Sequence, residues 1–407
     1  MKKEGYNVSG TFLKINQMLW KKSFLQGIRK LFYYIDSILL LGTGSRKKAK
    51  HETGKKRLLI VYNMALGDGI MFRGVDSYLR DIYPNEEWEI TIACQSAFKQ
   101  LYETSGIYDN IIPIDFSGAV VNLKKRRAMF KKLREEWYDE MLDPIGCELC
   151  TTNVYVSRAV LADRKIGVLD KTLPHYECSE RRQNKIYDYI VKIYEKDLHL
   201  IQFYGEVLKE LGAKNCVAKP AELPRFELDF ELPEKFFIIF PTASMAVKRW
   251  PAERFAQIAE KIYKEYDMPL VVCGTKHDEP VIMEMLKYIP DVPVINVIGK
   301  SSIMQFTEVI GRASLIVTND TSAYHIGVAR QVDTVMICGG YTYNRYARYN
   351  YADLGYKDPA LAHKTMDCYN CNNHCVYNNK ELFPCIDAIT TEMVWEEIVK
   401  FGGNYAD

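Results

Sequence analysis

The sequence predicts two α/β domains, each built on a doubly wound parallel sheet, preceded by a basic amphipathic extension. Short apolar runs alternate with longer amphipathic segments from residue 58 onward, as they do in βαβ units. This alternation restarts after the acidic stretch 227–234, so the chain divides near residues 220–235. A length of 407 residues, of which 48% are hydrophobic, supplies enough apolar side chains for two cores.

The first domain, over residues 58–225, is expected to begin with a buried strand at LLIVY. Apolar runs of this length predict buried strands, and longer stretches with apolar residues every three or four positions predict helices. The expected strands are 58–62, 89–93, 110–114 and 164–168, and the expected helices are 70–82, 97–105 and 123–136.

The second domain, over residues 235–390, repeats the pattern and is followed by a C-terminal helix and tail over 391–407. Its expected strands are 236–240, 270–273, 294–297, 315–318 and 335–338, and its expected helices are 252–265, 278–288, 303–312 and 322–330.

The distribution of charge separates residues 1–57 from the rest of the chain. This extension carries 14 lysines and arginines against three acidic residues, whereas the remaining 350 residues have a net charge of −9. An acidic body argues against nucleic acid as a partner. Residues 10–42 predict one or two basic amphipathic helices, which favour contact with an anionic membrane surface. The alternative is a helix packed on the body with its charges solvated.

Neither a membrane span nor a secretory signal is expected. The best apolar run, 31–41, is shorter than the roughly 18 residues needed to cross a bilayer, and it contains Asp36. The eleven cysteines are an odd number, and Cys94, Cys273 and Cys338 fall inside apolar strand-like runs. Reduced thiols in the cytoplasm explain this pattern better than a disulfide framework does.

Ligands of doubly wound sheets bind beyond the carboxyl ends of the strands, and the first such end is NMALGDG at residues 63–69. Its glycines allow a tight turn, and Asp68 falls where a carboxylate can act as a general base. The alternative is an aspartate that caps the following helix. Asn63 and Met64 are candidate acceptor contacts. The motif G-x-G-x-x-G is absent, so the turn is not a dinucleotide fingerprint.

Three further strand ends carry polar groups suited to a nucleotide diphosphate. The candidate donor and phosphate ligands are Thr242, Ser244, Lys248, Asp320, Thr321 and Ser322, and the candidate ribose or sugar contacts are Glu279 and His325. Hydroxyls and a lysine bind phosphate oxygens, and backbone amides at a helix start favour a diphosphate. The structural alternatives are a hydroxyl cap, an exposed lysine and a buried core histidine. Spacing alone does not fix which acid near Glu279 would hold a ribose.

Four segments together resemble glycosyltransferase family 9, the bacterial lipopolysaccharide heptosyltransferase family. They are LLIVYNMALGDGI from residue 58, FPTASMAVKRWPAERFAQIA from 240, LIVTNDTSAYHIGVA from 315 and CIDAITTEMVWEEI from 385. The resemblance covers about residues 58–400 and implies a GT-B fold, in which two Rossmann-like domains face each other across a cleft. It implies an inverting transfer that requires no metal ion. Asp68 would be the general base, and the second domain would bind a nucleotide-diphospho-sugar.

The chain departs from the family pattern at places that concern the donor and the acceptor. Met64-Ala65 stand where small hydroxyl residues are usual, NDTS stands for NDTG at Ser322, and CGGY at 338–341 stands for FGPT. ADP-heptose is the family's best-known donor, and these changes leave the sugar and the base open.

Three remaining features have both a functional and a structural interpretation. Cysteines in the pattern C-x2-C-x3-C-x9-C suit zinc or an iron–sulfur cluster, although reduced or paired thiols are preferred; they are Cys368, Cys371, Cys375 and Cys385. A basic helix with Lys124, Arg126 and Arg127 is a candidate contact for an anionic glycolipid acceptor, or a solvated face. The six tyrosines of residues 341–356 favour sugar or acceptor contacts, or interface packing.

The combined expectation is a cytoplasmic glycosyltransferase, peripherally attached to the inner membrane. It would add heptose or another hexose-like sugar to a lipopolysaccharide-core, capsule or lipid-linked glycan acceptor. Two alternatives belong to other classes: a GT-B sugar-nucleotide epimerase, and a non-catalytic sugar-nucleotide-binding protein of glycan assembly. Consumption of the donor only when an acceptor is present distinguishes transfer from both.

Overall fold

The computed structural model describes residues 34–41, 43, 54–145, 153–171, 184–371, 375, 382–402 and 405. Of the basic helices expected over residues 10–42, the part before residue 34 lies outside this range, and a helix forms over 34–40. The chain forms two compact units. The second unit contains Ala218–Asp407 and two earlier segments, Leu66–Gly74 and Asp197–Gln202, and the first unit contains the rest.

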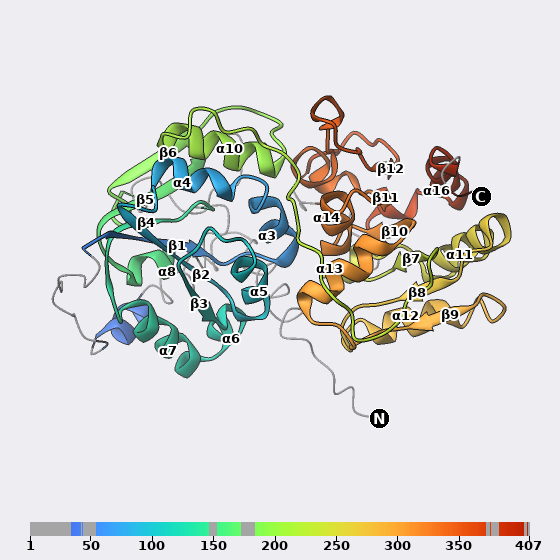
Figure 1. The fold of residues 1–407 in the computed structure, drawn as a ribbon, viewed down its shortest axis with the longest axis horizontal. Helices are drawn as coiled ribbons and strands as arrows, with labels where there is room; N and C mark the ends of the chain where they lie inside the picture. The colour runs from blue at the N-terminus through green and yellow to red at the C-terminus, as the bar shows by residue number, and fades with distance from the viewer. Residues whose placement is uncertain are drawn as a thin grey trace. The chain divides into compact units, whose positions relative to one another are not determined.

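The first unit is built on a six-stranded sheet with the order β3-β2-β1-β4-β5-β6, the strand order of the Rossmann fold (Figure 1). Every pair of neighbours is parallel. The strands are β1 (Lys56–Tyr62), β2 (Trp88–Gln95), β3 (Asn110–Ile114), β4 (Trp137–Leu142), β5 (Leu161–Asp170) and β6 (Tyr189–Ile193). The sequence did not predict β4 and β6, because charged residues interrupt the apolar runs of both.

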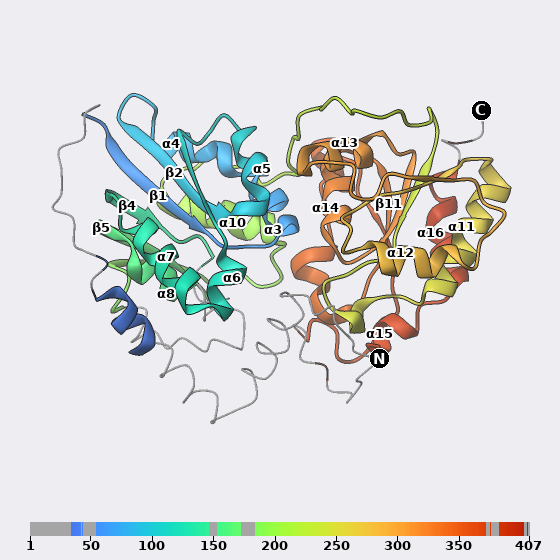
Figure 2. The same cartoon turned by 90° about the horizontal axis from the view of Figure 1, so that it is seen from below.

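Helices cover both faces of this sheet (Figure 2). Leu59 and Val61 of β1 pack into a core with α6 (Phe116–Val121), α7 (Leu123–Leu133) and α8 (Asn153–Ala159). On the opposite face, Tyr62 contacts Tyr102 of α5 (Lys99–Glu103), and its hydroxyl lies 3.0 Å from that of Tyr204 in α10 (Leu200–Leu211). The alternation of side chains along β1 therefore places helices on both faces, as a doubly wound sheet requires.

Val156 and Ala159 of α8 are buried in that core. The helix over residues 34–40 lies on the same side of the sheet, because Leu39 and Leu40 pack against this core. Part of the predicted basic extension is therefore packed on the first unit.

A buried ion pair fastens this N-terminal helix. Nε and Nη2 of Arg126 in α7 donate to the two carboxylate oxygens of Asp36 at 2.5 and 2.7 Å. Both side chains are buried, with 4% and 1% of their surface exposed. Arg158 of α8 adds a hydrogen bond of 2.7 Å to the hydroxyl of Ser37.

The second unit repeats the same topology, with the strand order β12-β11-β10-β7-β8-β9. All neighbours are again parallel. The strands are β7 (Phe237–Phe240), β8 (Leu270–Val272), β9 (Val294–Asn296), β10 (Leu315–Asn319), β11 (Asp333–Ile337) and β12 (Ala360–Ala362). The five strands expected in this half are confirmed within one or two residues. The three-residue β12 is too short to leave a pattern in the sequence.

The two faces of the second sheet are also covered by helices (Figure 2). Phe237, Ile239 and Val317 belong to one core, which packs against α11 (Ala252–Tyr266), α12 (Glu279–Leu286), α15 (Pro384–Asp387) and α16 (Thr391–Val399). On the other face lie α13 (Ile303–Arg312) and α14 (Ser322–Ala329). A Cβ added to Gly327 of α14 would come 2.5 Å from the hydroxyl of Thr334, so this glycine permits close packing of helix on strand.

The structure differs from the prediction of a single helix over residues 70–82. It begins earlier, as α3 (Leu66–Phe72), and the chain then turns before the 3-10 turn at Asp76–Tyr78 and α4 (Leu79–Ile82). The break falls at Gly74, where a Cβ would lie 2.1 Å from the carbonyl oxygen of Lys219. Among the helices that the structure describes, none is both long and apolar enough to cross a membrane.

Candidate active site

Both sheets change direction of winding between their first and fourth strands, which are β1 and β4 in one sheet and β7 and β10 in the other. Ligands of such sheets bind at the carboxyl ends of the strands at this point. Asp68 follows β1, Lys248 follows β7, and Asp320 follows β10. The topology therefore puts the predicted site residues where the fold class binds ligands.

The structure brings Lys248 and Asp320 together. Lys248 ends the short helical turn Ala246–Lys248, and its Nζ lies 3.3 Å from Oδ2 of Asp320. The same ammonium group lies over the ring of Tyr341, 4.1 Å from its centroid. About 11% of the lysine side chain and 12% of the aspartate side chain are exposed, so this pair can meet a ligand.

Asn319, the last residue of β10, connects the end of this strand to the loop after β7. Its side chain donates to the carbonyl oxygen of Pro241 at 2.7 Å and accepts from the backbone N–H of Trp250 at 3.2 Å. Between these two residues, Thr242 is buried and Ser244 is exposed. The loop that carries the candidate phosphate ligands is thus tied at both ends to the end of β10.

The start of α14 has the features of an anion site. Thr321 is the N-cap residue, with extended backbone at φ −155°, and its side chain makes no capping hydrogen bond within the described chain. Thr321 and Ser322 are both half-buried. The first amides of the helix point outward and carry the positive end of the helix dipole, so they favour a phosphate group.

Asp68 lies in the first turn of α3, and α3 packs directly on α14. The point of contact is Gly67: a Cβ there would come 2.7 Å from Cδ2 of His325. Six of the seven residues of α3 are buried, whereas Asp68 is half-buried. The predicted base therefore belongs to the same compact unit as the predicted phosphate ligands.

His325 is a buried residue of this contact, with 4% of its surface exposed. Its Nδ1 lies 2.9 Å from the hydroxyl of Tyr349. Burial lowers the pKa of His325 to about 4, although the charge of Asp320 opposes the shift. The ring is therefore neutral at pH 7. The sugar contact expected of His325 stays a prediction, and the interactions seen for this ring are internal.

The other residues predicted for the site are not part of the contacts described above. Glu279 is exposed at the first position of α12, while Asn63 and Met64 are half-buried directly after β1. Lys124 and Arg127 are exposed on α7. Arg126, in contrast, is 3% exposed and uses its guanidinium group to bind Asp36, so we assign it to the attachment of the N-terminal helix.

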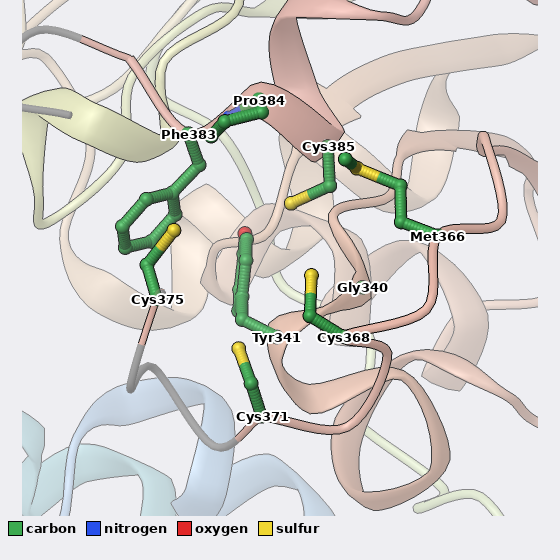
Figure 3. Close-up of a pocket in the computed structure, with 9 residues that line it drawn as sticks. All are labelled: Gly340, Tyr341, Met366, Cys368, Cys371, Cys375, Phe383, Pro384 and Cys385. Carbon is green, nitrogen blue, oxygen red and sulfur yellow. The ribbon is translucent and has the colours of Figure 1, made fainter. Parts of the chain in front are cut away.

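Four cysteines gather in the second unit (Figure 3). Cys368, Cys371, Cys375 and Cys385 line one pocket together with Gly340, Tyr341, Met366, Phe383 and Pro384. Burial raises the pKa of the Cys385 thiol. No group of three histidine, cysteine or acidic side chains among the described residues is arranged to hold a metal ion.

Sequence reasoning did not identify two residues beside the site, Tyr349 and His199. Their ring centroids lie 4.3 Å apart, and both side chains are buried. The tyrosine-rich segment 341–356 drew attention to this region, but nothing in it distinguishes one tyrosine from another. His199 has no neighbouring motif, so its place beside Tyr349 is a result of the tertiary structure.

Comparisons with known proteins agree with this architecture. The family model described as "Glycosyltransferase family 9 (heptosyltransferase)" matches residues 126–373. Lipooligosaccharide heptosyltransferase 2 of Haemophilus influenzae is 29% identical over 85 residues, which are 20% of this chain and 24% of that protein. The chain thus aligns with about a quarter of the length of this curated relative.

Solved structures match over most of the chain. A family 9 glycosyltransferase from Veillonella parvula has a TM-score of 0.69 and 19% identity, over 87% of this chain and 99% of that one. The heptosyltransferase WaaC of E. coli, solved with ADP-2-deoxy-2-fluoro heptose, has a TM-score of 0.59 and 16% identity, over 84% and 99%. The iron-containing glycosyltransferase TibC of enterotoxigenic E. coli has a TM-score of 0.50 and 12% identity, over 88% and 80%.

These likenesses confirm the predicted α/β fold of the GT-B class with its two Rossmann-like parts. The family model extends over more than half of the chain and includes β7, Lys248, Asp320 and α14. The chain belongs to glycosyltransferase family 9.

Proposed function

We propose that the protein transfers heptose or a related hexose-like sugar from a nucleotide-diphospho-sugar to a lipopolysaccharide-core, capsule or lipid-linked glycan acceptor. The observation that carries this proposal is the contact of α3 with α14, which puts Asp68 in one compact unit with Lys248, Asp320 and the start of α14. A base and a diphosphate site close together are what sugar transfer with a diphosphate leaving group requires.

In this reaction, the carboxylate of Asp68 accepts the proton of the acceptor hydroxyl. The hydroxyl oxygen forms a bond to the anomeric carbon, and the bond from that carbon to the diphosphate oxygen breaks. A single displacement of this kind inverts the anomeric centre. The nucleoside diphosphate leaves with the bonding electrons, and its growing negative charge is stabilised by Lys248 and by the amides of Thr321 and Ser322.

Nζ of Lys248 is paired with Oδ2 of Asp320 at 3.3 Å. A bound diphosphate would compete for the lysine and release the Asp320 carboxylate to accept hydrogen bonds from sugar hydroxyls. Ser244, which is exposed on the loop after β7, supplies a further hydroxyl for phosphate oxygens. ADP-heptose is the first donor to test, because a substituted ADP-heptose was bound to the similar enzyme WaaC.

We also propose that the transfer needs no metal ion, since a lysine and backbone amides supply the positive charge that a metal would. TibC, which shares the fold, contains iron, so the purified protein should also be analysed for metal. Transfer that continues in EDTA supports the proposal. Loss of transfer in EDTA, with recovery on adding back one metal, would contradict it.

Donor-binding and turnover assays of wild type and Asp68→Asn test the function. The substitution removes the base and keeps the size of the side chain. We expect unchanged stabilisation by nucleoside diphosphate and a fall in acceptor-dependent transfer of about 100-fold or more, the usual contribution of general-base catalysis. Normal turnover by the variant would show that another group is the base. Donor consumption without an acceptor would instead favour the epimerase alternative.

A membrane surface is the proposed location of the acceptor. The outward side of the helix over 34–40 and the residue after it present Tyr34, Ile38 and Leu41, which are 64%, 66% and 73% exposed. Leu123 is 52% exposed at the start of α7, one turn before Arg126, which binds this helix. The exposed Lys124, Arg127 and Lys131 follow on α7, which has no acidic residue. Exposed apolar side chains next to cations suit an anionic lipid surface of the cytoplasmic side of the inner membrane.

A further inference from the structure

Tyr349 connects two histidines in the interior of the second unit. Its hydroxyl lies 2.9 Å from Nδ1 of His325, and its ring centroid lies 4.3 Å from that of His199. The three side chains are 6%, 4% and 3% exposed. His199 is itself fixed, because its Nε2 lies 3.4 Å from the carbonyl oxygen of Tyr346 and its Nδ1 lies 3.4 Å from the N–H of Ile201.

The network of Tyr349, His325 and His199 contacts the backbone next to the predicted base, Asp68. The His325 ring lies so close to Gly67 that a Cβ at that residue would come 2.7 Å from Cδ2 and 3.4 Å from Nε2. Gly67 directly precedes Asp68 in the first turn of α3. The imidazole therefore packs against the beginning of α3 where α3 contacts α14, and its Nδ1 is hydrogen-bonded to the hydroxyl of Tyr349.

The groups of the network carry no charge at neutral pH. Burial lowers the pKa of His199 to about 3 and that of His325 to about 4. Burial raises the pKa of the Tyr349 hydroxyl, and the charges of Tyr351 and Asp68 raise it further, so the hydroxyl keeps its proton. A neutral network can hold Asp68 without competing for the proton that it accepts.

We propose that Tyr349 is a positioning residue of the transfer reaction: its hydroxyl orients His325 against Gly67 and so holds the Asp68 carboxylate in place. The inference rests on the proposed function, because it assumes that Asp68 is the base. It assigns a role to one of the six tyrosines of residues 341–356. The proposed donor and phosphate ligands do not account for these tyrosines.

The test compares Tyr349→Phe with Tyr351→Phe. Tyr351 is a matched control: it is 3% exposed, its ring centroid is 5.9 Å from that of Tyr349, and its hydroxyl has no hydrogen-bond partner among the described residues. We expect Tyr349→Phe to lower kcat about 3- to 10-fold, as the loss of one hydrogen bond allows, with the donor KM unchanged. The acid limb of its kcat/KM profile against pH should shift. Tyr351→Phe should match wild type in both measurements.

A second variant separates positioning from packing. Gly67→Ala pushes against the same imidazole, so it should also lower kcat. Combined with Tyr349→Phe, it should lower kcat by less than the product of the two single effects, because both act through His325. This double-mutant cycle still measures the coupling between Tyr349 and Gly67 if one variant is less stable, provided that folded protein is assayed. Independent, multiplying effects would overturn the proposal.

The outcomes also separate this inference from the proposed function. If Asp68→Asn abolishes transfer but Tyr349→Phe equals wild type in kcat and in pH profile, the function stands and the positioning role is wrong. If both tyrosine variants lose the same activity, packing explains the loss and the role is again wrong. If Asp68→Asn keeps full activity, the proposed base is wrong and the role of Tyr349 is wrong with it.

Discussion

At the scale of single residues, Lys248, the proposed phosphate ligand, is held in place by two neighbouring side chains. The residue is largely buried between the carboxylate of Asp320 and the ring of Tyr341, which restricts the rotamers that a free lysine would sample. Ordering a lysine side chain costs about 1.5–2 kcal/mol of conformational free energy. Because folding has already ordered this one, the cost does not fall on donor binding.

We expect Lys248→Met to weaken nucleoside diphosphate binding about 10- to 150-fold, since a hydrogen bond from a charged group contributes about 1.5–3 kcal/mol. Titration calorimetry with ADP, GDP and UDP measures the effect. Lys264→Met is the control, because Lys264 is 69% exposed on α11 and pairs there with Glu260. Equal affinity of wild type and Lys248→Met would exclude the lysine as a phosphate ligand.

The buried histidines predict how stability depends on pH. The pKa of His199 in the folded protein is about 3, below the ordinary value of 6.5, so the unfolded chain binds more protons between these values. Stability is therefore fully present above about pH 6.5 and is lost as the pH falls toward 3. We expect His199→Gln to reduce the pH dependence of the unfolding free energy by up to about 1.4 kcal/mol per pH unit in this window.

Urea unfolding at pH 7, 6 and 5 measures this slope. His277→Gln is the control, since it makes the same substitution at an exposed position after β8. An unchanged slope in His199→Gln would mean that the imidazole is not buried neutral. His325 contributes to the slope in the same direction, because burial also lowers its pKa, to about 4.

At the scale of single elements, the helix over 34–40 depends on one interaction that its own sequence does not reveal. Asp36 interrupts an apolar run and would be solvated in an isolated helix. In the structure it faces inward and receives two hydrogen bonds from Arg126. A buried carboxylate is tolerated when a guanidinium group pairs with both of its oxygens.

Arg126→Met should destabilise the first unit by about 3–5 kcal/mol, because it leaves the Asp36 carboxylate buried without its partner. Adding Asp36→Leu should restore much of the loss, as apolar replacements of buried ion pairs often do. Chemical unfolding measures both. Lys125→Met is a matched control on the same helix, because its exposed pair with Asp115 contributes at most about 1 kcal/mol. Equal effects at positions 125 and 126 would contradict this account.

At the scale of the whole molecule, basic residues are concentrated in a different part of the sequence from the candidate active site. The extension and α7 are basic, whereas the rest of the chain is acidic overall. This distribution of charge supports the proposal that the basic part of the first unit contacts an anionic lipid surface.

We expect the double variant Ile38→Asp and Leu41→Asp to lose binding to vesicles with anionic lipid, because both side chains are exposed and would insert at the lipid surface. Co-sedimentation of the full chain with anionic and with zwitterionic vesicles measures binding. Met283→Asp is the control, since Met283 is also exposed, at 43%, but lies on α12. Undiminished binding of the double variant would remove this surface from the proposal, and binding to zwitterionic vesicles would argue against the role of charge.

The sequence determined the fold class, most strands, and the position of the candidate site residues after the ends of strands. Continuous apolar runs such as 58–62 and 315–318 identify buried strands because both faces of a parallel sheet are covered. Strands β4 and β6 were not predicted, because Asp139 and Lys192 interrupt their apolar runs. The early start of α3 was not predicted, because glycines at 67 and 69 weaken the helical pattern there.

Only the tertiary structure decided which of these residues meet. The pairing of Lys248 with Asp320, 72 positions apart, and of Arg126 with Asp36, 90 positions apart, depends on the order of strands in each sheet. The contact of Gly67 with His325 and the place of Tyr349 beside two histidines likewise leave no local signal. Periodicity reports how each segment meets its immediate surroundings, whereas long-range contacts follow from how the segments pack together, and packing is a property of the whole fold.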